Sequence, residues 1–402
     1  MFTKIANAIT KLLNNYTNFK SQNINNQSTN TINKNNTHDK TNSNINKTHD
    51  EINNNDDIMH YENNTDDELP NYIDNQEDNN IELNKSDEDN FINVSSDDMS
   101  ICSSENNEDL NKYIEILEEK GYVIIPNVYN QDEINDYWYE FNKWMSNVPN
   151  LNYLHNVIDF NGIFKHHQVG HQRFAWQART NPKILNIFKK LWNTDDLVTS
   201  FDGCCYYPSN YENSPTYWTH SDQSSLKKGL NCYQSFLSLT NNCERTLIIY
   251  EATHKCHQSY FKTMGIEEPR DWNIIDENYL INNHMEKQRF LNVKAGDLVI
   301  WDSRTFHQNT CGNLGCNEER LIQYLCYLPK NNVKNDKTER KQRIKFFEKK
   351  RTTSHWPYPM NVVPEQPNMY NYYYPGNKIY IDYETLPKPY LDDLLPEINK
   401  LL

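Results

Sequence analysis

The sequence lacks any long apolar run. Its 402 residues contain no stretch of about 18 consecutive apolar residues, the length that crosses a bilayer, so the sequence predicts no membrane-spanning helix. Residues 1–20 lack the continuous apolar core of a secretory signal, and they contain no Arg, which argues against a mitochondrial address. The nine cysteines are odd in number and follow no secretory signal. We therefore expect reduced thiols and an intracellular, cytoplasmic location.

A basic excess is also absent. The chain has 55 acidic and 40 basic residues, and residues 1–110 hold 21 of the acidic and 7 of the basic ones. The remaining stretch has 34 acidic and 33 basic residues and is nearly neutral. Because a protein that binds nucleic acid presents a basic face, we expect no nucleic-acid partner.

Apolar residues are sparse in residues 21–108, where Asn, Asp, Glu, Ser and Thr dominate. Such a segment buries too little apolar surface to offset its ordering entropy, so we expect a disordered tail. An acidic tail that orders on an unknown partner is the alternative. Residues 1–20 differ, because Phe2, Ile5 and Ile9 recur near helical spacing. They predict either a short amphipathic helix that touches a membrane or a partner, or a marginal helix with no such role.

Structured sequence begins near Asp109. Helical spacing predicts helices over residues 110–120, 131–145 and 182–192, and Gly121 suits the end of the first helix. Runs of β-branched, aromatic and aliphatic residues predict strands over residues 122–126, 197–207, 233–239, 246–250, 298–301 and 320–328. Helices followed by many strands predict an α+β, mainly β domain over residues 109–330, built as a β-sandwich or jelly roll flanked by helices.

Residues 331–402 form a C-terminal extension. The strongly basic stretch Lys330–Arg351 predicts a helix with Ile344, Phe346 and Phe347 available for docking. A solvated helix that packs on the domain is favoured there over a nucleic-acid role. The Tyr- and Pro-rich sequence beyond Pro357 is expected to lie along the surface and to pack on the domain.

A possible metal site lies in the segment Tyr217-Trp-Thr-His-Ser-Asp-Gln223. Residues two apart in an extended chain point the same way, so His220 and Asp222 would present an imidazole and a carboxylate to one spot. One neutral nitrogen and one hard oxygen are two corners of the facial triad that binds Fe(II) and leaves neighbouring positions open.

A third ligand should come from a distant strand. His307 follows the apolar run of Gly296-Asp-Leu-Val-Ile-Trp-Asp-Ser-Arg-Thr-Phe-His307 and is the best candidate. Further on, Arg320 opens an apolar strand, and a guanidinium there is costly to bury unless an anion meets it. A dicarboxylate would be such an anion.

These segments resemble one known family, the phytanoyl-CoA dioxygenase-like Fe(II)/2-oxoglutarate oxygenases. GYVIIPNVYNQDEI is similar to that family's first strand and following helix, WTHSDQS to its H-x-D strand, and KAGDLVIWDSRTFHQNT to the strand of its distal His. The resemblance covers residues 121–329 and implies a double-stranded β-helix, or cupin-like jelly roll. It also implies that His220, Asp222 and His307 bind Fe(II) and that Arg320 binds the distal carboxylate of 2-oxoglutarate.

The activity implied by the resemblance is a dioxygenase reaction. O₂ and 2-oxoglutarate would be consumed, succinate and CO₂ released, and a C–H bond of a small-molecule or lipid-like substrate hydroxylated, with ascorbate as an optional reductant. Halogenating relatives replace the carboxylate ligand with a small residue, so Asp222 favours hydroxylation. Five residues near the motifs could line the substrate pocket: Tyr206, Trp218, Gln223, Trp301 and Arg304.

Two other interpretations remain open at this point. The chain could be a non-catalytic jelly-roll protein with an unused metal site. It could also hold a structural zinc ion, for which short Cys pairs are typical. The residues available for zinc are Cys243, His254, Cys256, His257, Cys311 and Cys316.

Overall fold

The computed structural model describes residues 107–149, 151, 161–212, 215–367 and 380–402. The predicted helix at residues 1–20 and nearly all of the predicted tail at residues 21–108 lie outside these ranges. Among the residues described, no helix is long and apolar enough to cross a membrane.

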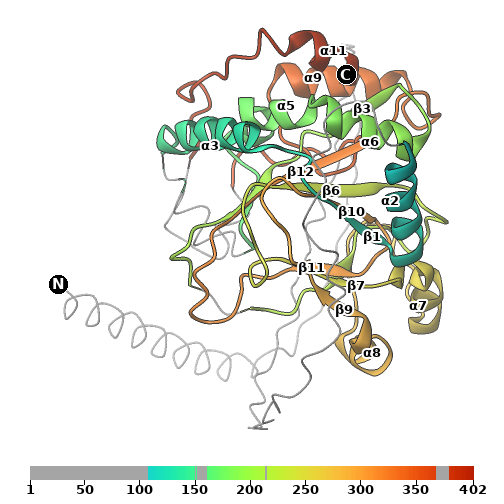
Figure 1. The fold of residues 1–402 in the computed structure, drawn as a ribbon. Helices are drawn as coiled ribbons and strands as arrows, with labels where there is room; N and C mark the ends of the chain where they lie inside the picture. Colours follow the sequence, from blue (N-terminus) through green and yellow to red (C-terminus); the bar gives the residue numbers. More distant parts are fainter. Residues whose placement is uncertain (1–106, 150, 152–160, 213–214, 368–379) are drawn as a thin grey trace, which may run out of the picture. The chain divides into compact units, whose positions relative to one another are not determined.

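Two antiparallel sheets form the centre of the domain (Figure 1). The larger sheet has the order β1-β10-β6-β12-β4-β2, and β3 pairs with β12. Its strands are β1 (Tyr122–Ile125), β2 (Ile163–Phe164), β3 (Leu197–Thr199), β4 (Cys204–Tyr207), β6 (Tyr233–Ser238), β10 (Leu298–Asp302) and β12 (Arg320–Pro329). The smaller sheet has the order β8-β5-β11-β7-β9. Its strands are β5 (His220–Ser221), β7 (Leu247–Tyr250), β8 (Asn273–Ile274), β9 (Gln288–Phe290) and β11 (His307–Asn309).

Alternation along the strands of the larger sheet sorts its side chains onto two faces. In β10, Val299 and Trp301 pack toward residues of the smaller sheet such as Ile249, whereas Leu298 and Ile300 pack toward the helices. The other central strands alternate in the same way, as expected for a sheet buried on both faces. The chain therefore folds as a mainly β, double-stranded β-helix, or jelly roll, flanked by helices, as the sequence predicts.

Helices cover the outer face of the larger sheet. Figure 1 shows α3, α5, α6, α9 and α11 together on that side, with α7 and α8 beside the smaller sheet. The α-helices are α2 (Asn107–Lys120), α3 (Gln131–Ser146), α5 (Arg173–Arg179), α6 (Pro182–Trp192), α7 (His257–Met264), α8 (Glu277–Asn283), α9 (Lys337–Glu348) and α11 (Leu395–Leu401). The 3-10 helices are η2 (Val169–His171), η3 (Thr253–Lys255) and η4 (Met285–Lys287).

Local sequence explains where the long helices begin and end. Asn130 and Glu133 form a capping box at the start of α3, in which each side chain accepts a hydrogen bond from the other residue's backbone N–H. Asn181 caps α6, and Pro182 occupies its first turn, where a missing N–H costs nothing. Gly121 follows α2 with a φ of +80°, a left-handed conformation that glycine adopts readily.

Two details of the fold differ from what the sequence predicts or were not predicted. The single strand expected over residues 197–207 is broken into β3 and β4, both of which pair with β12, and residues 200–203 between them belong to neither strand. The short helix α5 was not foreseen, since residues 150–180 carry weak periodicity. In the sequence beyond Pro357, which was expected to lie along the surface and pack on the domain, Tyr358, Met360 and Ile398 are buried.

The basic helix α9 docks through aromatic side chains. Phe346 is buried against Trp176 and Phe201, with Phe347 beside them. Ile344, which was expected to take part in docking, is 45% exposed. The buried charged residue of α9 is Arg343, whose Nη2 donates to the Asn335 side chain at 2.9 Å.

Candidate metal centre

Strand pairing in the smaller sheet brings three distant side chains together. His220 opens β5, and Asp222 follows two residues later on the same side of the extended chain. His307 opens β11, and its backbone pairs directly with that of His220. The antiparallel register therefore places the two imidazoles next to each other, with ring centroids 4.5 Å apart.

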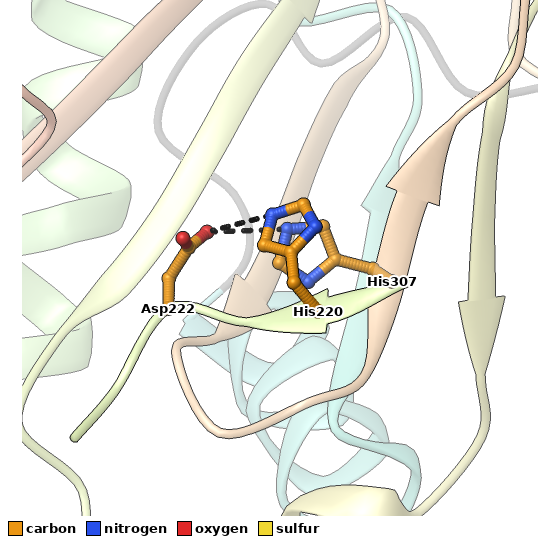
Figure 2. Close-up of side chains that lie close together, drawn as sticks. All are labelled: His220, Asp222 and His307. Atoms are coloured by element: carbon orange, nitrogen blue, oxygen red, sulfur yellow. Dashed lines mark ion pairs between the residues drawn. The ribbon is translucent and has the colours of Figure 1, made fainter. Parts of the chain in front are cut away.

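The three side chains converge on one point, as Figure 2 shows. The Nε2 atoms of His220 and His307 lie 3.6 and 3.3 Å from the same Asp222 carboxylate oxygen. All three candidate ligand atoms lie within 4.8 Å of one another, and all three residues are buried. Within the described part of the chain, no other group of three His, Cys, Asp or Glu side chains has such an arrangement.

Hydrogen bonds orient each of these side chains. The Nδ1 atoms of His220 and His307 lie 2.9 Å from the carbonyl oxygens of Trp218 and Thr305. A carbonyl can only accept, so Nδ1 carries the proton and Nε2 keeps its lone pair directed at the centre. The Gln234 amide donates to the Asp222 carboxylate at 2.9 Å.

Burial and charge keep two of the groups in their metal-binding forms. Burial raises the pKa of Asp222, but the interactions of its carboxylate with the His220 and His307 side chains outweigh this effect and hold that pKa well below its ordinary value. Burial, together with the charge of His220, lowers the pKa of His307. At neutral pH the site therefore offers a carboxylate and a neutral imidazole.

The donor set fits a divalent metal ion. Two imidazole lone pairs and a carboxylate oxygen that face one another repel unless a cation lies between them. Two His and one carboxylate are the ligands of non-heme Fe(II) sites that leave positions open for other ligands. The geometry of this chain's own residues thus satisfies the requirements for such an ion.

A cavity of about 350 Å³ opens beside the three side chains. His220, Asp222 and His307 lie in its wall. Much of the remaining wall is aromatic, with Trp218, Trp272, Trp301, Phe236 and Tyr324. Two of the predicted pocket residues, Trp218 and Trp301, are therefore where the sequence analysis expected them.

The other three predicted pocket residues lie elsewhere. Tyr206 points toward the helices, and its hydroxyl donates to Glu319 at 2.8 Å. The buried Gln223 side chain accepts a hydrogen bond from the Ser303 hydroxyl and donates to the carbonyl oxygens of Lys227 and Gly229. Arg304 pairs with the carboxylate of Asp302. These predictions were wrong because the facing of a side chain depends on strand register and loop path.

Arg320 is a buried cation that forms no ion pair with any described residue. The side chain is fully buried, and its Nε and Nη2 atoms have no hydrogen-bond partner among the described residues. Its Nη1 lies 3.7 Å from the sulfur of Cys205, and its guanidinium lies 5.6 Å from the ring centroid of Phe236, a cavity-wall residue. A buried guanidinium normally requires an anion and hydrogen-bond acceptors, so this side chain is suited to bind a carboxylate from outside the chain.

The alternative zinc site is not assembled. Cys243 lies beside Glu318, His254 bonds to the carbonyl of Glu118, and His257 bonds to Ser221. The zinc interpretation is therefore wrong for these residues, which do not meet at one point. The cysteines that the structure describes are free thiols.

Sequence reasoning missed several polar residues of the cavity wall. They include Asp202, Gln234 and His355. Asp202 lies in the break between β3 and β4, within a range that was expected to be one strand, and His355 belongs to the C-terminal extension. Neither residue has a spacing relative to His220 or His307 that predicts its position.

No family model matches the chain. The Aspergillus versicolor protein named "Ava biosynthesis cluster protein O" is 28% identical over 233 residues, which cover 52% of this chain and 75% of that protein. Among solved structures, the epimerase SnoN in complex with Fe³⁺, α-ketoglutarate and nogalamycin RO is 16% identical, with a TM-score of 0.40 over 55% of this chain and 84% of that one.

EctD from S. alaskensis, solved with 2-oxoglutarate and 5-hydroxyectoine, is also 16% identical, with a TM-score of 0.41 over 57% of this chain and 80% of that one. GIG2 from Candida albicans, of the DUF1479 group, is 14% identical, with a TM-score of 0.43 over 54% and 62% of the two chains. At such identities and TM-scores a reaction is not transferable from these proteins to this chain.

Proposed function

We propose that the chain is an Fe(II)- and 2-oxoglutarate-dependent dioxygenase that hydroxylates a small-molecule or lipid-like substrate and releases succinate and CO₂. One observation is the main support for this proposal. Three candidate metal-ligand atoms converge on the wall of a cavity, and behind that wall lies the fully buried guanidinium of Arg320, whose Nε and Nη2 have no hydrogen-bond partner among the described residues. A metal ion and a carboxylate-bearing co-substrate satisfy both features at once.

Each part of the site then has a role. His220, Asp222 and His307 hold the ion from one side and leave its cavity side open. Arg320 receives the distal carboxylate of 2-oxoglutarate. When bound, Fe(II) and 2-oxoglutarate supply the means to activate O₂ for oxidation of a C–H bond, and ascorbate serves to keep the ion reduced. Gln234 orients the Asp222 carboxylate through its 2.9 Å hydrogen bond.

The cavity wall governs access of water and substrate. Trp218 stacks on His220 with ring centroids 4.8 Å apart, and Trp301 lies 5.3 Å from the ring of His307. Large aromatic side chains next to the ligands keep water away from the reacting position and offer apolar surface to a substrate. We expect these rings to hold an apolar substrate body over the open side of the ion.

The sequence motifs favour the phytanoyl-CoA dioxygenase-like group within this class. The segments around His220 and His307 are similar to the H-x-D and distal-His strands of that group. The Aspergillus relative takes its name from a biosynthesis cluster, which supports a small molecule rather than a macromolecule as substrate.

Spectroscopy under anaerobic conditions tests the proposal before any substrate is known. Fe(II) and 2-oxoglutarate added together to the full chain should give a weak visible charge-transfer band, and neither addition alone should do so. The variant His220→Ala should lose the band. If the wild-type chain gives no band, the jelly roll is a non-catalytic protein and the proposal fails.

A further inference from the structure

The C-terminal extension returns to the cavity. Beyond α9, the backbone N–H of Thr353 donates to the Phe201 carbonyl at 3.1 Å, and the N–H of Phe201 donates to the Thr353 hydroxyl at 3.0 Å. Asp202 directly follows Phe201, and His355 lies two residues after Thr353. Both line the cavity. These two hydrogen bonds between Thr353 and Phe201 therefore bring a carboxyl group and an imidazole from distant stretches of chain to the same cavity.

The returning segment is held firmly on both sides. The ring of His171 bonds to the Arg351 carbonyl at 2.9 Å, and the Val363 N–H donates to the Thr352 carbonyl at 2.9 Å. His171 and Thr352 are both buried. His355 is thus presented from an anchored strand-like segment, and little ordering entropy remains to be lost when a ligand binds to it.

Neighbouring residues fix the position of Asp202 as well. The Gly203 N–H donates to one carboxylate oxygen of Asp202 at 2.7 Å, and the fully buried Arg179 donates to the Asp202 carbonyl. A Cβ atom on Gly203 would lie 1.9 Å from the carbonyl oxygen of Phe164, so only glycine fits after Asp202. No described residue donates to the second carboxylate oxygen, which remains available to a ligand.

His355 has an unused ring nitrogen. Its Nε2 atom is buried and has no hydrogen-bond partner in the described structure. Burial lowers the pKa of His355, so the ring is neutral at neutral pH and can accept a hydrogen bond. Burial raises the pKa of Asp202 to about 7, so a donor or a cation beside it would stabilise the carboxylate form.

We propose that Asp202 and His355 form the substrate-recognition site of the cavity. They bind a hydroxyl or amino hydrogen-bond donor on a ring-containing molecule, while the rings of Trp218, Trp272 and Trp301 hold its apolar body. This inference rests on the proposed function, because it places the substrate next to the triad. Buried polar groups that lose a partner discriminate strongly between ligands with and without the matching group, so this pair sets selectivity.

Three matched probes test the inference on the full chain loaded anaerobically with Fe(II) and 2-oxoglutarate: benzylamine, benzyl alcohol and toluene. They share a ring and differ in the donor. Binding is followed by quenching of tryptophan fluorescence and by a shift of the charge-transfer band. The wild-type chain should bind benzylamine and benzyl alcohol at least about tenfold more tightly than toluene. This is the ratio of affinities that one well-made hydrogen bond provides.

Two variants remove one partner each. Asp202→Asn keeps the acceptor for the Gly203 N–H and places an amide donor where the free oxygen stood, so the preference for benzylamine should disappear. His355→Phe leaves the hydrogen bonds around Asp202 intact and should reduce the preference for benzyl alcohol. Toluene affinity should stay unchanged in both. Asp195→Asn, a change at a side chain that is 95% exposed, is the matched control and should bind all probes like the wild type.

The outcomes separate the two proposals. If the band forms in the wild type and in both variants, but both variants keep the full donor preference, the recognition site is refuted and the proposed function stands. A wild-type chain that binds toluene as tightly as the two donor probes refutes it too. Absence of the band in the wild type instead contradicts the proposed function, and with it the placement of the substrate.

Discussion

Replacing Arg320 with methionine separates the role of this side chain in binding from any role in folding. The guanidinium is fully buried, and two of its three nitrogens have no hydrogen-bond partner among the described residues. Methionine fills a similar volume without a charge. In the chain without 2-oxoglutarate, the variant Arg320→Met should therefore not lose stability. Relief of an uncompensated buried charge should raise its free energy of unfolding by up to about 3 kcal/mol.

The same change should sharply weaken 2-oxoglutarate binding. A guanidinium can grip a carboxylate with two parallel hydrogen bonds, and loss of such a buried, charge-assisted contact costs about 3 kcal/mol. That loss corresponds to a dissociation constant about 100-fold higher. Anaerobic titration of the Fe(II)-loaded chain with 2-oxoglutarate, followed by the charge-transfer band, measures this constant. Thermal unfolding of the ligand-free chain measures the stability.

Arg245 provides a contrasting buried arginine. Its side chain is 1% exposed, and its nitrogens donate to the carbonyl oxygens of Pro208, Tyr211, Cys311, Cys316 and Glu318. Arg245→Met leaves these five carbonyl acceptors, several of them buried, without this donor and should unfold at a much lower temperature than the wild type. The reasoning is refuted if Arg320→Met binds 2-oxoglutarate as tightly as the wild type, or if it is as unstable as Arg245→Met.

Three further predictions concern the metal and pH. Asp222→Ala should lose iron-dependent succinate formation and bound iron, and metal analysis after dialysis against Fe(II) checks the second loss; retention of one equivalent of iron would contradict the ligand assignment. Gln234→Leu removes the donor to Asp222 and should weaken iron binding about 10- to 100-fold, as judged by competition with a chelator; an unchanged affinity would show that the hydrogen bond does not matter. Burial lowers the pKa of His171 to about 3, so the folded chain keeps a neutral ring where the unfolded chain, with an ordinary pKa near 6.5, binds a proton. Stability should therefore fall as pH drops from about 6.5 toward 3, and His171→Gln should reduce the slope of unfolding free energy against pH by about 1.4 kcal/mol per unit. Urea titrations at pH 6 and pH 4 give the unfolding free energies; if the wild type and the variant lose the same free energy between these two pH values, His171 is not the cause.

Part of the candidate site follows from sequence by simple geometry. His220 and Asp222 share a side because alternate residues of an extended chain do so. The place of His307 does not follow from local spacing, since it depends on the direct pairing of β11 with β5. Its pairing was foreseeable only through the resemblance of the surrounding segment to a known strand pattern.

The errors have a common physical origin in register and chain path. Tyr206 was assigned to the pocket, yet in β4 its neighbours Cys205 and Tyr207 face the smaller sheet, and Tyr206 faces the helices. If the register of β4 were shifted by one residue, Tyr206 would face the smaller sheet instead, because successive side chains of a strand point to opposite faces. His355 reaches the cavity through the pairing of Thr353 with Phe201, a long-range contact that leaves no periodic pattern in the sequence.

The return of the C-terminal extension to the cavity places one of the two residues of the proposed recognition site, His355, outside the jelly roll. The strands of the jelly roll carry the ligands of the proposed ion, whereas His355 comes from a segment that contributes no strand to either sheet. Under the proposed function, substitutions in that segment should therefore change which molecule is oxidised and leave His220, Asp222 and His307 in place. Exchange of residues 351–363 between relatives offers a direct route to enzymes with altered substrate choice.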